Sequence, residues 1–140
     1  MIPKTAEYAL RAAVMLARSP EQAHSADEIA ESVHMPRRYA HKVLQALVRA
    51  RLVRSQPGPG GGYSLIRPPE ALSILDVVAA IEPIARIRRC PLGLKSHTSL
   101  CPLHRELDDA AAAMERAFAR VTIDQLLNQP DSVPPLCELR

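Results

Sequence analysis

Two cysteines and two histidines close together in the chain carry the side chains best suited to chemistry. They are Cys90, His97, Cys101 and His104. Thiolates and imidazoles bind zinc and iron–sulfur clusters, and thiols also form reversible disulfides. The four groups could hold zinc, although their spacing is not that of a standard zinc finger. A disulfide switch or a surface loop without cofactor are the remaining alternatives, and Cys137, near the C-terminus, is expected to be incidental.

A catalytic thiol is the enzymatic alternative, with Cys101 as nucleophile and His104 as base. Such catalysis needs a third group that orients the base and a site that stabilises the developing negative charge. Neighbouring residues on one exposed loop provide neither, so we expect no enzyme. The sequence lacks a signal peptide and any apolar run near the ~20 residues of a membrane span. We therefore expect a cytoplasmic protein without a disulfide framework.

The elements that position this loop are predicted to be mostly helical. Apolar residues make up 47% of the chain and aromatic residues only 3%, which favours packed helices over a β-sandwich. Periodicity and turn residues predict helices over residues 3–17, 25–33, 36–50, 73–81, 102–121 and 122–127, and strands over 52–55 and 63–66. Ser25 with Glu28 predicts a capping box, Pro36 suits a first helical turn, and Ser73 and Thr122 are candidate caps.

The third predicted helix has one apolar face and one face of hydrogen-bond donors. Tyr39, Val43, Leu44, Leu47 and Val48 form the apolar stripe. The opposite side carries Arg38, His41, Lys42, Gln45 and Arg49 at helical spacing. Four Arg and Lys without one Asp or Glu lie between positions 36 and 50, which indicates a surface for a polyanion.

A glycine-rich turn follows this helix and separates two short strands. Gly58-Pro59-Gly60-Gly61-Gly62 lacks the Lys-Ser/Thr ending of a phosphate-binding loop and opens no helix, so we discard a nucleotide site. Helix, short turn, donor-lined helix and β-hairpin form the order of a winged helix-turn-helix DNA-binding domain.

The predicted DNA contacts divide into base contacts and backbone contacts. Arg38, His41 and Lys42 are best placed to read bases in the major groove. Arg37, Arg49 and Arg54 are expected to contact phosphates. The predicted DNA-contacting set also includes Ser25, Tyr39, Gly60 and Gly61.

The charge distribution separates the chain into two halves. Residues 1–67 carry ten Lys and Arg against five Asp and Glu, whereas residues 68–140 carry eight against ten. We expect a DNA-binding domain over 1–83, a Cys/His sensor loop over 84–104, a dimerisation helix with a short terminal helix over 105–127, and a flexible tail over 128–140. The apolar stripe of Leu107, Ala111, Met114 and Phe118 needs a partner surface, so we expect a homodimer on a palindromic DNA operator.

Several motifs together resemble one family of bacterial winged-helix regulators. They are Glu7-Tyr8-Ala9-Leu10-Arg11, the Tyr39 helix with its LysValLeuGlnAlaLeuVal, the wing GlyProGlyGlyGlyTyr, the exit ArgProPro, SerIleLeuAspValVal, and a Cys loop before a long helix. The family includes the iron–sulfur cluster assembly regulator and the nitric-oxide-sensitive repressor. The similarity covers about residues 1–127.

This resemblance implies a dimer through the long C-terminal helix and an iron–sulfur cluster, expected to be of the [2Fe-2S] type, held by the Cys loop. Cys90 and Cys101 match the first and third cysteine ligands, but the middle cysteine is missing. Glu7 matches the helix-one acid that ligates the cluster from the partner chain, and His104 or His97 would complete the set.

The sequence departs from the family at two further positions. Pro57 replaces the basic residue that often precedes the wing, and Arg51 replaces a Gly that usually ends the recognition helix. The prediction is therefore a DNA-binding regulator, a repressor, whose affinity responds to an iron–sulfur or redox site. Zinc, a disulfide, no cofactor, or a protein-binding scaffold with the same fold are the alternatives.

Overall fold

The computed structural model describes residues 1–130 and 133–136 and has the predicted mostly helical, winged-helix architecture. In chain order its elements are α1 (Lys4–Arg18), α2 (Ala26–Ser32), α3 (Arg37–Arg49), β1 (Val53–Gln56), β2 (Gly62–Leu65), the 3-10 helix η1 (Pro69–Ala71), α4 (Ile74–Ile81), α5 (Pro102–Ala119) and α6 (Ile123–Leu127). Cys137 and part of the predicted tail lie outside the described residues.

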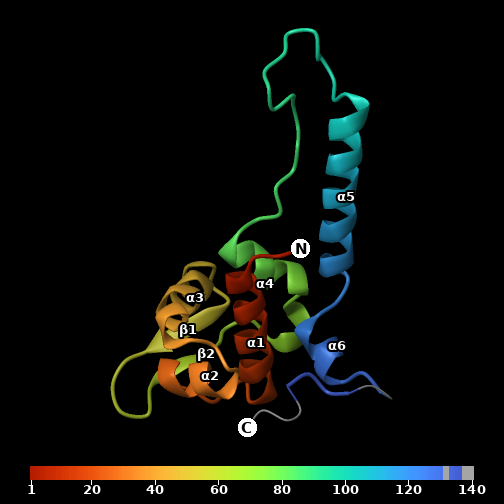
Figure 1. Ribbon diagram of the computed structural model, residues 1–140. Helices are drawn as coiled ribbons and strands as arrows, with labels where there is room; N and C mark the ends of the chain where they lie inside the picture. Colours follow the sequence, from red (N-terminus) through yellow and green to blue (C-terminus); the bar gives the residue numbers. More distant parts are fainter. Residues whose placement is uncertain (131–132, 137–140) are drawn as a thin grey trace.

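Helix α1 is the centre of the core and contacts α2, α3, α4 and α6 (Figure 1). Its alanines at positions 9 and 12 are fully buried, which lets neighbouring helices approach closely. Leu16 of α1, Ile29 of α2 and Leu44 of α3 are also fully buried. One apolar core therefore holds the helix-turn-helix in place.

Three of the helices have a small polar residue as N-cap, whose side chain accepts a hydrogen bond from the first helical turn. Ser73 starts α4 with a complete capping box, because its hydroxyl accepts from the Asp76 N–H and its own N–H donates to the Asp76 carboxylate. Thr122 caps α6 in the same way. The capping box predicted at Ser25 is only half formed: its hydroxyl accepts from the Glu28 N–H, but the Glu28 carboxylate pairs with His24 instead. Pro36 occupies the N-cap position of α3, one residue before the first turn.

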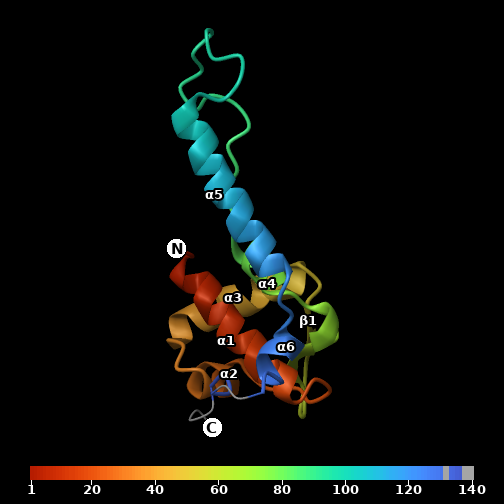
Figure 2. The same ribbon diagram turned by 90° about the vertical axis from the view of Figure 1, so that its right-hand side faces the viewer.

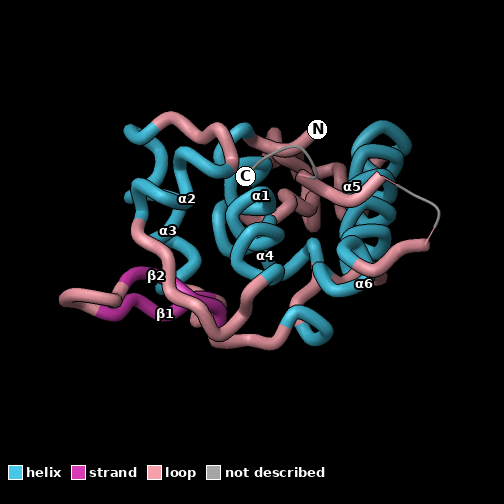
Figure 3. Tube along the Cα trace, turned by 90° about the horizontal axis from the view of Figure 1, so that it is seen from below, coloured by secondary structure: helices cyan, strands magenta, loops and turns pink. Residues whose placement is uncertain are grey.

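The wing is a two-stranded antiparallel hairpin with Val53 opposite Leu65 and Gln56 opposite Gly62. Seen from below, its loop extends away from the helical body (Figure 3). Arg51, which follows the end of α3, has a φ of +61°, the left-handed conformation expected where related chains carry glycine. The left-handed residue turns the chain from α3 into the first strand.

Helix α5, none of whose residues is fully buried, projects from this body, and the segment of residues 82–101 runs up beside it and turns back beyond its N-terminal end (Figures 1 and 2). The helix ends at Ala119, two residues before the predicted boundary. The following segment returns to the body, where Ile74 N–H donates to the Val121 carbonyl at 2.9 Å and Ile123 N–H to the Leu72 carbonyl at 2.8 Å. Only the C-terminal end of α5 is therefore joined to the body by backbone hydrogen bonds among the described residues.

Candidate nucleic-acid interface and sensor loop

The donor face of α3 lies outward. Ala40, Val43, Leu44 and Leu47 point into the core, so the opposite side of the helix is left to solvent. Arg38, His41, Lys42 and Arg49 are all exposed on that side. Gln45 is only half-exposed, because its side-chain amide lies 3.4 Å from the Tyr63 hydroxyl of the wing. The exposed donors form one strip along the helix.

At the start of α3, aromatic and basic side chains stack. The Arg38 guanidinium lies 4.9 Å from the centre of the Tyr39 ring, and it lowers the pKa of that phenol. The Tyr39 ring in turn lies 5.4 Å from the ring of Tyr8 in α1. Tyr39 therefore braces the helix against α1. Arg37 is exposed, and its guanidinium lies 3.8 Å from the carboxylate of Asp27. At this distance and in solvent the ion pair is weak.

The wing is attached to the body by a contact that the sequence did not predict. His24, between α1 and α2, exchanges two backbone hydrogen bonds with Tyr63, at 2.9 and 2.7 Å. The pair forms an isolated antiparallel bridge, which fixes the connection between α1 and α2 beside β2. Arg54 and Gly60 are exposed, and Gly61 and Ser25 are half-exposed. No local pattern in the sequence marks this pairing.

The thiol of Cys90 is buried in a turn of its own loop. Backbone N–H groups of Leu94 and, less strongly, of Leu92 and Gly93 lower the pKa of this thiol. A ring of N–H donors around sulfur favours the thiolate, the form that binds metals and reacts with oxidants.

The other predicted ligands of the loop are only partly brought together. Cys101 Sγ lies 3.3 Å from His104 Nδ1 at the start of α5. His97 has a buried Nδ1 atom without a hydrogen-bond partner among the described residues. Glu7, in contrast, lies in the body and pairs with Arg11 at 2.9 Å. Within residues 1–130 and 133–136, no three His, Cys, Asp or Glu side chains gather as metal ligands.

A network of ion pairs that no sequence pattern predicts holds the loop against α5. Arg86 donates to both carboxylate oxygens of Asp108, at 2.7 and 2.9 Å, and to Glu115 at 2.8 Å. Asp108 also accepts from the Ile87 N–H at 2.8 Å. The guanidinium is the main cause that lowers the pKa of Asp108, to about 2. Residues so far apart in the chain carry no periodic signal that could have revealed the pair.

The residues predicted for dimerisation line one side of α5. Leu107 is 51% exposed, and Ala111, Met114 and Phe118 are half-buried. Leu107, Ala111 and Met114 also line a cavity of about 560 Å³ together with Met1, Ile2 and Val78. The apolar side of α5 therefore continues into the apolar residues of the body that line the same cavity. Among the described residues, no helix is long and apolar enough to cross a membrane.

Comparison with known proteins agrees with this architecture. A family model described as Rrf2, iron-dependent transcriptional regulator, matches residues 2–129. The protein described as HTH-type transcriptional regulator BadM of Rhodopseudomonas palustris is 32% identical over 131 residues, which cover 94% of this chain and 83% of the relative. An rrf2-like HTH-type regulator of Rhodobacter capsulatus is 36% identical over 126 residues, 86% of this chain and 81% of the relative.

Solved structures share the fold. IscR of T. potens superposes with a TM-score of 0.76 at 20% identity and covers 94% of this chain and 88% of its own. CymR, the global cysteine regulator of B. subtilis, superposes with a TM-score of 0.74 at 25% identity and covers 94% and 98%. These matches confirm the predicted resemblance and a DNA-binding regulator rather than an enzyme. The chain belongs to the Rrf2 family of iron-dependent transcriptional regulators.

Proposed function

We propose that the protein is a sequence-specific repressor that reads a palindromic operator with α3 and responds to the state of its Cys/His loop. The observation that carries the proposal is the exposed strip of Arg38, His41 and Lys42 on a helix whose other face is buried. In this assignment residues 1–83 bind DNA, residues 84–104 sense, and residues 105–127 dimerise. The loop and the long helix serve the regulation of that DNA-binding unit.

The first experiment separates base contacts from phosphate contacts. Alanine at Arg38 or Lys42 should cost roughly 1–3 kcal/mol at a specific operator, because each side chain can pair with a base edge. Alanine at Arg54 should weaken all sequences alike and reduce the salt dependence by about one phosphate contact. Arg116→Ala on α5, exposed and far from α3, is the charge-matched control. Wild-type operator affinity in both α3 variants would refute the groove assignment.

Dimerisation through α5 places two recognition helices on one face of the duplex. A two-fold pair of α5 helices would cover the apolar stripe of Leu107, Ala111, Met114 and Phe118, and it would set the α3 helices about one DNA turn apart. The operator should then be palindromic. A monomer at micromolar concentration in light scattering would contradict this part of the proposal.

The donor set of the loop suits an iron–sulfur cluster, but one chain does not complete it. Cys90 is surrounded by N–H donors and Cys101 adjoins His104, while His97 has a buried nitrogen without a hydrogen-bond partner in the part of the chain that the structure describes. These are the ligand types that such clusters accept. Cys90, Cys101 and either His104 or His97 would supply three ligands, and Glu7 of the partner subunit would supply the fourth. When bound, a cluster would supply a group whose charge changes with its redox state.

The spectrum of anaerobically purified protein tests the sensor. Visible absorption with matching iron and sulfide supports the cluster, and Cys101→Ser should abolish it. Glu7→Gln should alter the spectrum while the far-ultraviolet circular dichroism remains unchanged. An unaltered spectrum in this variant would exclude the cross-chain ligand and leave the position to His97 or His104. A colourless protein with stoichiometric zinc would select a zinc site instead.

A further inference from the structure

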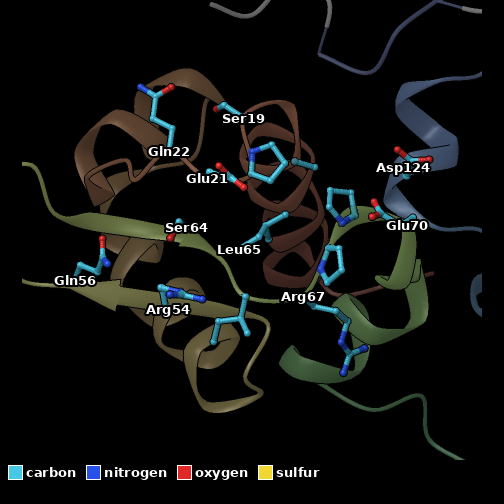
Figure 4. A pocket seen from close by; sticks show the side chains of 15 residues that line it. Ser19, Glu21, Gln22, Arg54, Gln56, Ser64, Leu65, Arg67, Glu70 and Asp124 are labelled. Carbon is cyan, nitrogen blue, oxygen red and sulfur yellow. The ribbon is translucent and has the colours of Figure 1, made fainter.

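A cavity of about 990 Å³ lies beside the wing and is also lined by residues of α1, η1 and α6 (Figure 4). The hairpin contributes Arg54, Gln56 and Ser64, the connection between α1 and α2 contributes Glu21, and α6 contributes Asp124. This volume lies within the range of pockets that hold small molecules. The cavity also joins three segments of the DNA-binding unit that are distant in sequence.

Opposite charges stand at its two ends. Arg54 and Gln56 extend from the strands at one end, whereas Glu70 and Asp124 lie next to each other at the other end (Figure 4). Glu21 lies between the two ends in this view. Because a cleft focuses the field of the charges that line it, this arrangement favours a ligand with separate anionic and cationic groups.

The lining charges are not neutralised within the described chain. Arg67 also lines the cavity, but its guanidinium pairs with Asp76 at 2.8 Å. Arg54, Glu21 and Glu70 have no ion-pair partner among residues 1–130 and 133–136. The Asp124 carboxylate accepts a hydrogen bond from the neutral amide of Asn128, at 2.8 Å, and has no ion-pair partner among those same residues. Three carboxylates and one available guanidinium therefore remain for a ligand.

One wall of the cavity is apolar and stiff. Leu65 and the three proline residues Pro20, Pro68 and Pro69 line it. Proline has a fixed φ and no N–H group, so this wall offers aliphatic surface without competing donors. A ligand with an aliphatic chain between its charged groups fits such a wall.

We propose that this cavity binds a basic amino acid, such as L-arginine or L-lysine. Its carboxylate would pair with Arg54, its side-chain cation with Glu70 and Asp124, and its α-ammonium group with Glu21. One negative and two positive groups on the ligand complement one guanidinium and three carboxylates on the protein. The aliphatic part of the side chain packs on the proline wall.

Binding has a consequence for DNA that rests on the proposed function. Arg54 is also the residue assigned to a DNA phosphate, and it cannot pair fully with a ligand carboxylate and a phosphate at once. The ligand therefore weakens DNA binding, and DNA weakens ligand binding by the same factor. DNA binding by the wing is thereby regulated by a ligand at a site separate from the Cys/His loop.

Calorimetric titration of the DNA-free protein with L-arginine tests the site. We expect one ligand per chain, and agmatine, which has the same guanidinium but no carboxylate, should bind about tenfold more weakly. Arg54→Ala, Glu70→Gln and Asp124→Asn should each weaken L-arginine binding about tenfold, the effect of one charged hydrogen bond. Arg116→Ala should not change it. No saturation by roughly 10 mM L-arginine or L-lysine, or binding unaffected by all three pocket variants, would overturn the site.

Fluorescence anisotropy with a labelled non-specific duplex tests the coupling at constant ionic strength. Saturating L-arginine should weaken DNA binding of the wild type about tenfold, and Arg54→Ala should remove the response. L-Arginine that binds in the calorimeter but leaves the wild-type DNA affinity unchanged would overturn the competition. Failure of the ligand-free wild type to bind the duplex would refute the proposed function instead, and the calorimetric result would still decide the pocket.

Discussion

Gly62 at the start of β2 permits the contact that attaches the wing to the body. Its φ is +133°, and a Cβ atom there would lie 2.4 Å from the His24 carbonyl oxygen and 2.5 Å from the His24 carbonyl carbon. Both are backbone atoms that cannot turn away. Gly62→Ala must therefore displace the connection between α1 and α2 and break the bridge between His24 and Tyr63.

The expected loss of stability is the sum of the broken backbone hydrogen bonds and the backbone strain. Two backbone hydrogen bonds contribute about 1 kcal/mol each, and an alanine at positive φ costs about 1–2 kcal/mol. Gly62→Ala should therefore lower the free energy of unfolding by about 3–4 kcal/mol, a large part of the stability of a small protein. At about 3 °C per kcal/mol, Tm should fall by about 10 °C.

Gly60→Ala provides the matched control. Gly60 lies in the same turn with a φ of +74°, but nothing lies within 4 Å of a Cβ built there. Gly60→Ala should lower the free energy of unfolding only by the cost of an alanine at positive φ, about 1–2 kcal/mol. Urea unfolding measures both variants, and amide hydrogen exchange at Tyr63 reports the bridge itself. Equal stability of the two variants, with Tyr63 still protected in Gly62→Ala, would refute this reasoning.

Three further predictions concern the loop and α5. Arg86 lowers the pKa of Asp108 to about 2 from an ordinary value of 3.8, so Asp108 stabilises the fold fully above about pH 4 and loses this effect as pH falls toward 2. The difference in urea unfolding between wild type and Asp108→Asn should shrink from pH 4 to pH 2 and vanish below pH 2, and a difference that does not change over this range would contradict the ion pair. The N–H groups of Leu94, then of Leu92 and Gly93, lower the pKa of Cys90, so in Cys101→Ser its alkylation by iodoacetamide should rise with a midpoint below the ordinary ~8.5. A midpoint at or above that value would exclude thiolate stabilisation. Leu107→Asp should halve the mass measured by light scattering, because it would place a charge in the apolar stripe of α5 between the two chains. An unchanged mass would exclude this face from the dimer.

Features that depend on neighbouring residues were predictable from the sequence. The apolar and donor faces of α3 follow from helical periodicity, and the wing follows from its run of glycines between two short strands. Ser73 and Thr122 begin their helices as predicted, because an N-cap is decided within one helical turn.

Contacts between distant segments were decided only by the packing of the helices. The sequence indicates a box at Ser25 and Glu28, but the fold places His24 beside that carboxylate and completes only half of the box. The bridge from His24 to Tyr63 exists because α2 and the wing are held on the same core. The residues around His24 and those around Tyr63 show no pattern that predicts their pairing.

The same limit applies to the ligands of the loop. The sequence identifies Cys90, Cys101 and His104 as candidates by their types, but the folded chain brings only Cys101 and His104 into contact. Arg86 and Asp108 hold the start of the loop along α5, across a sequence separation at which side-chain charge carries no pairing information. Local periodicity specifies which faces are buried, whereas the tertiary structure decides which functional groups meet, because their distances depend on the summed packing of every element between them.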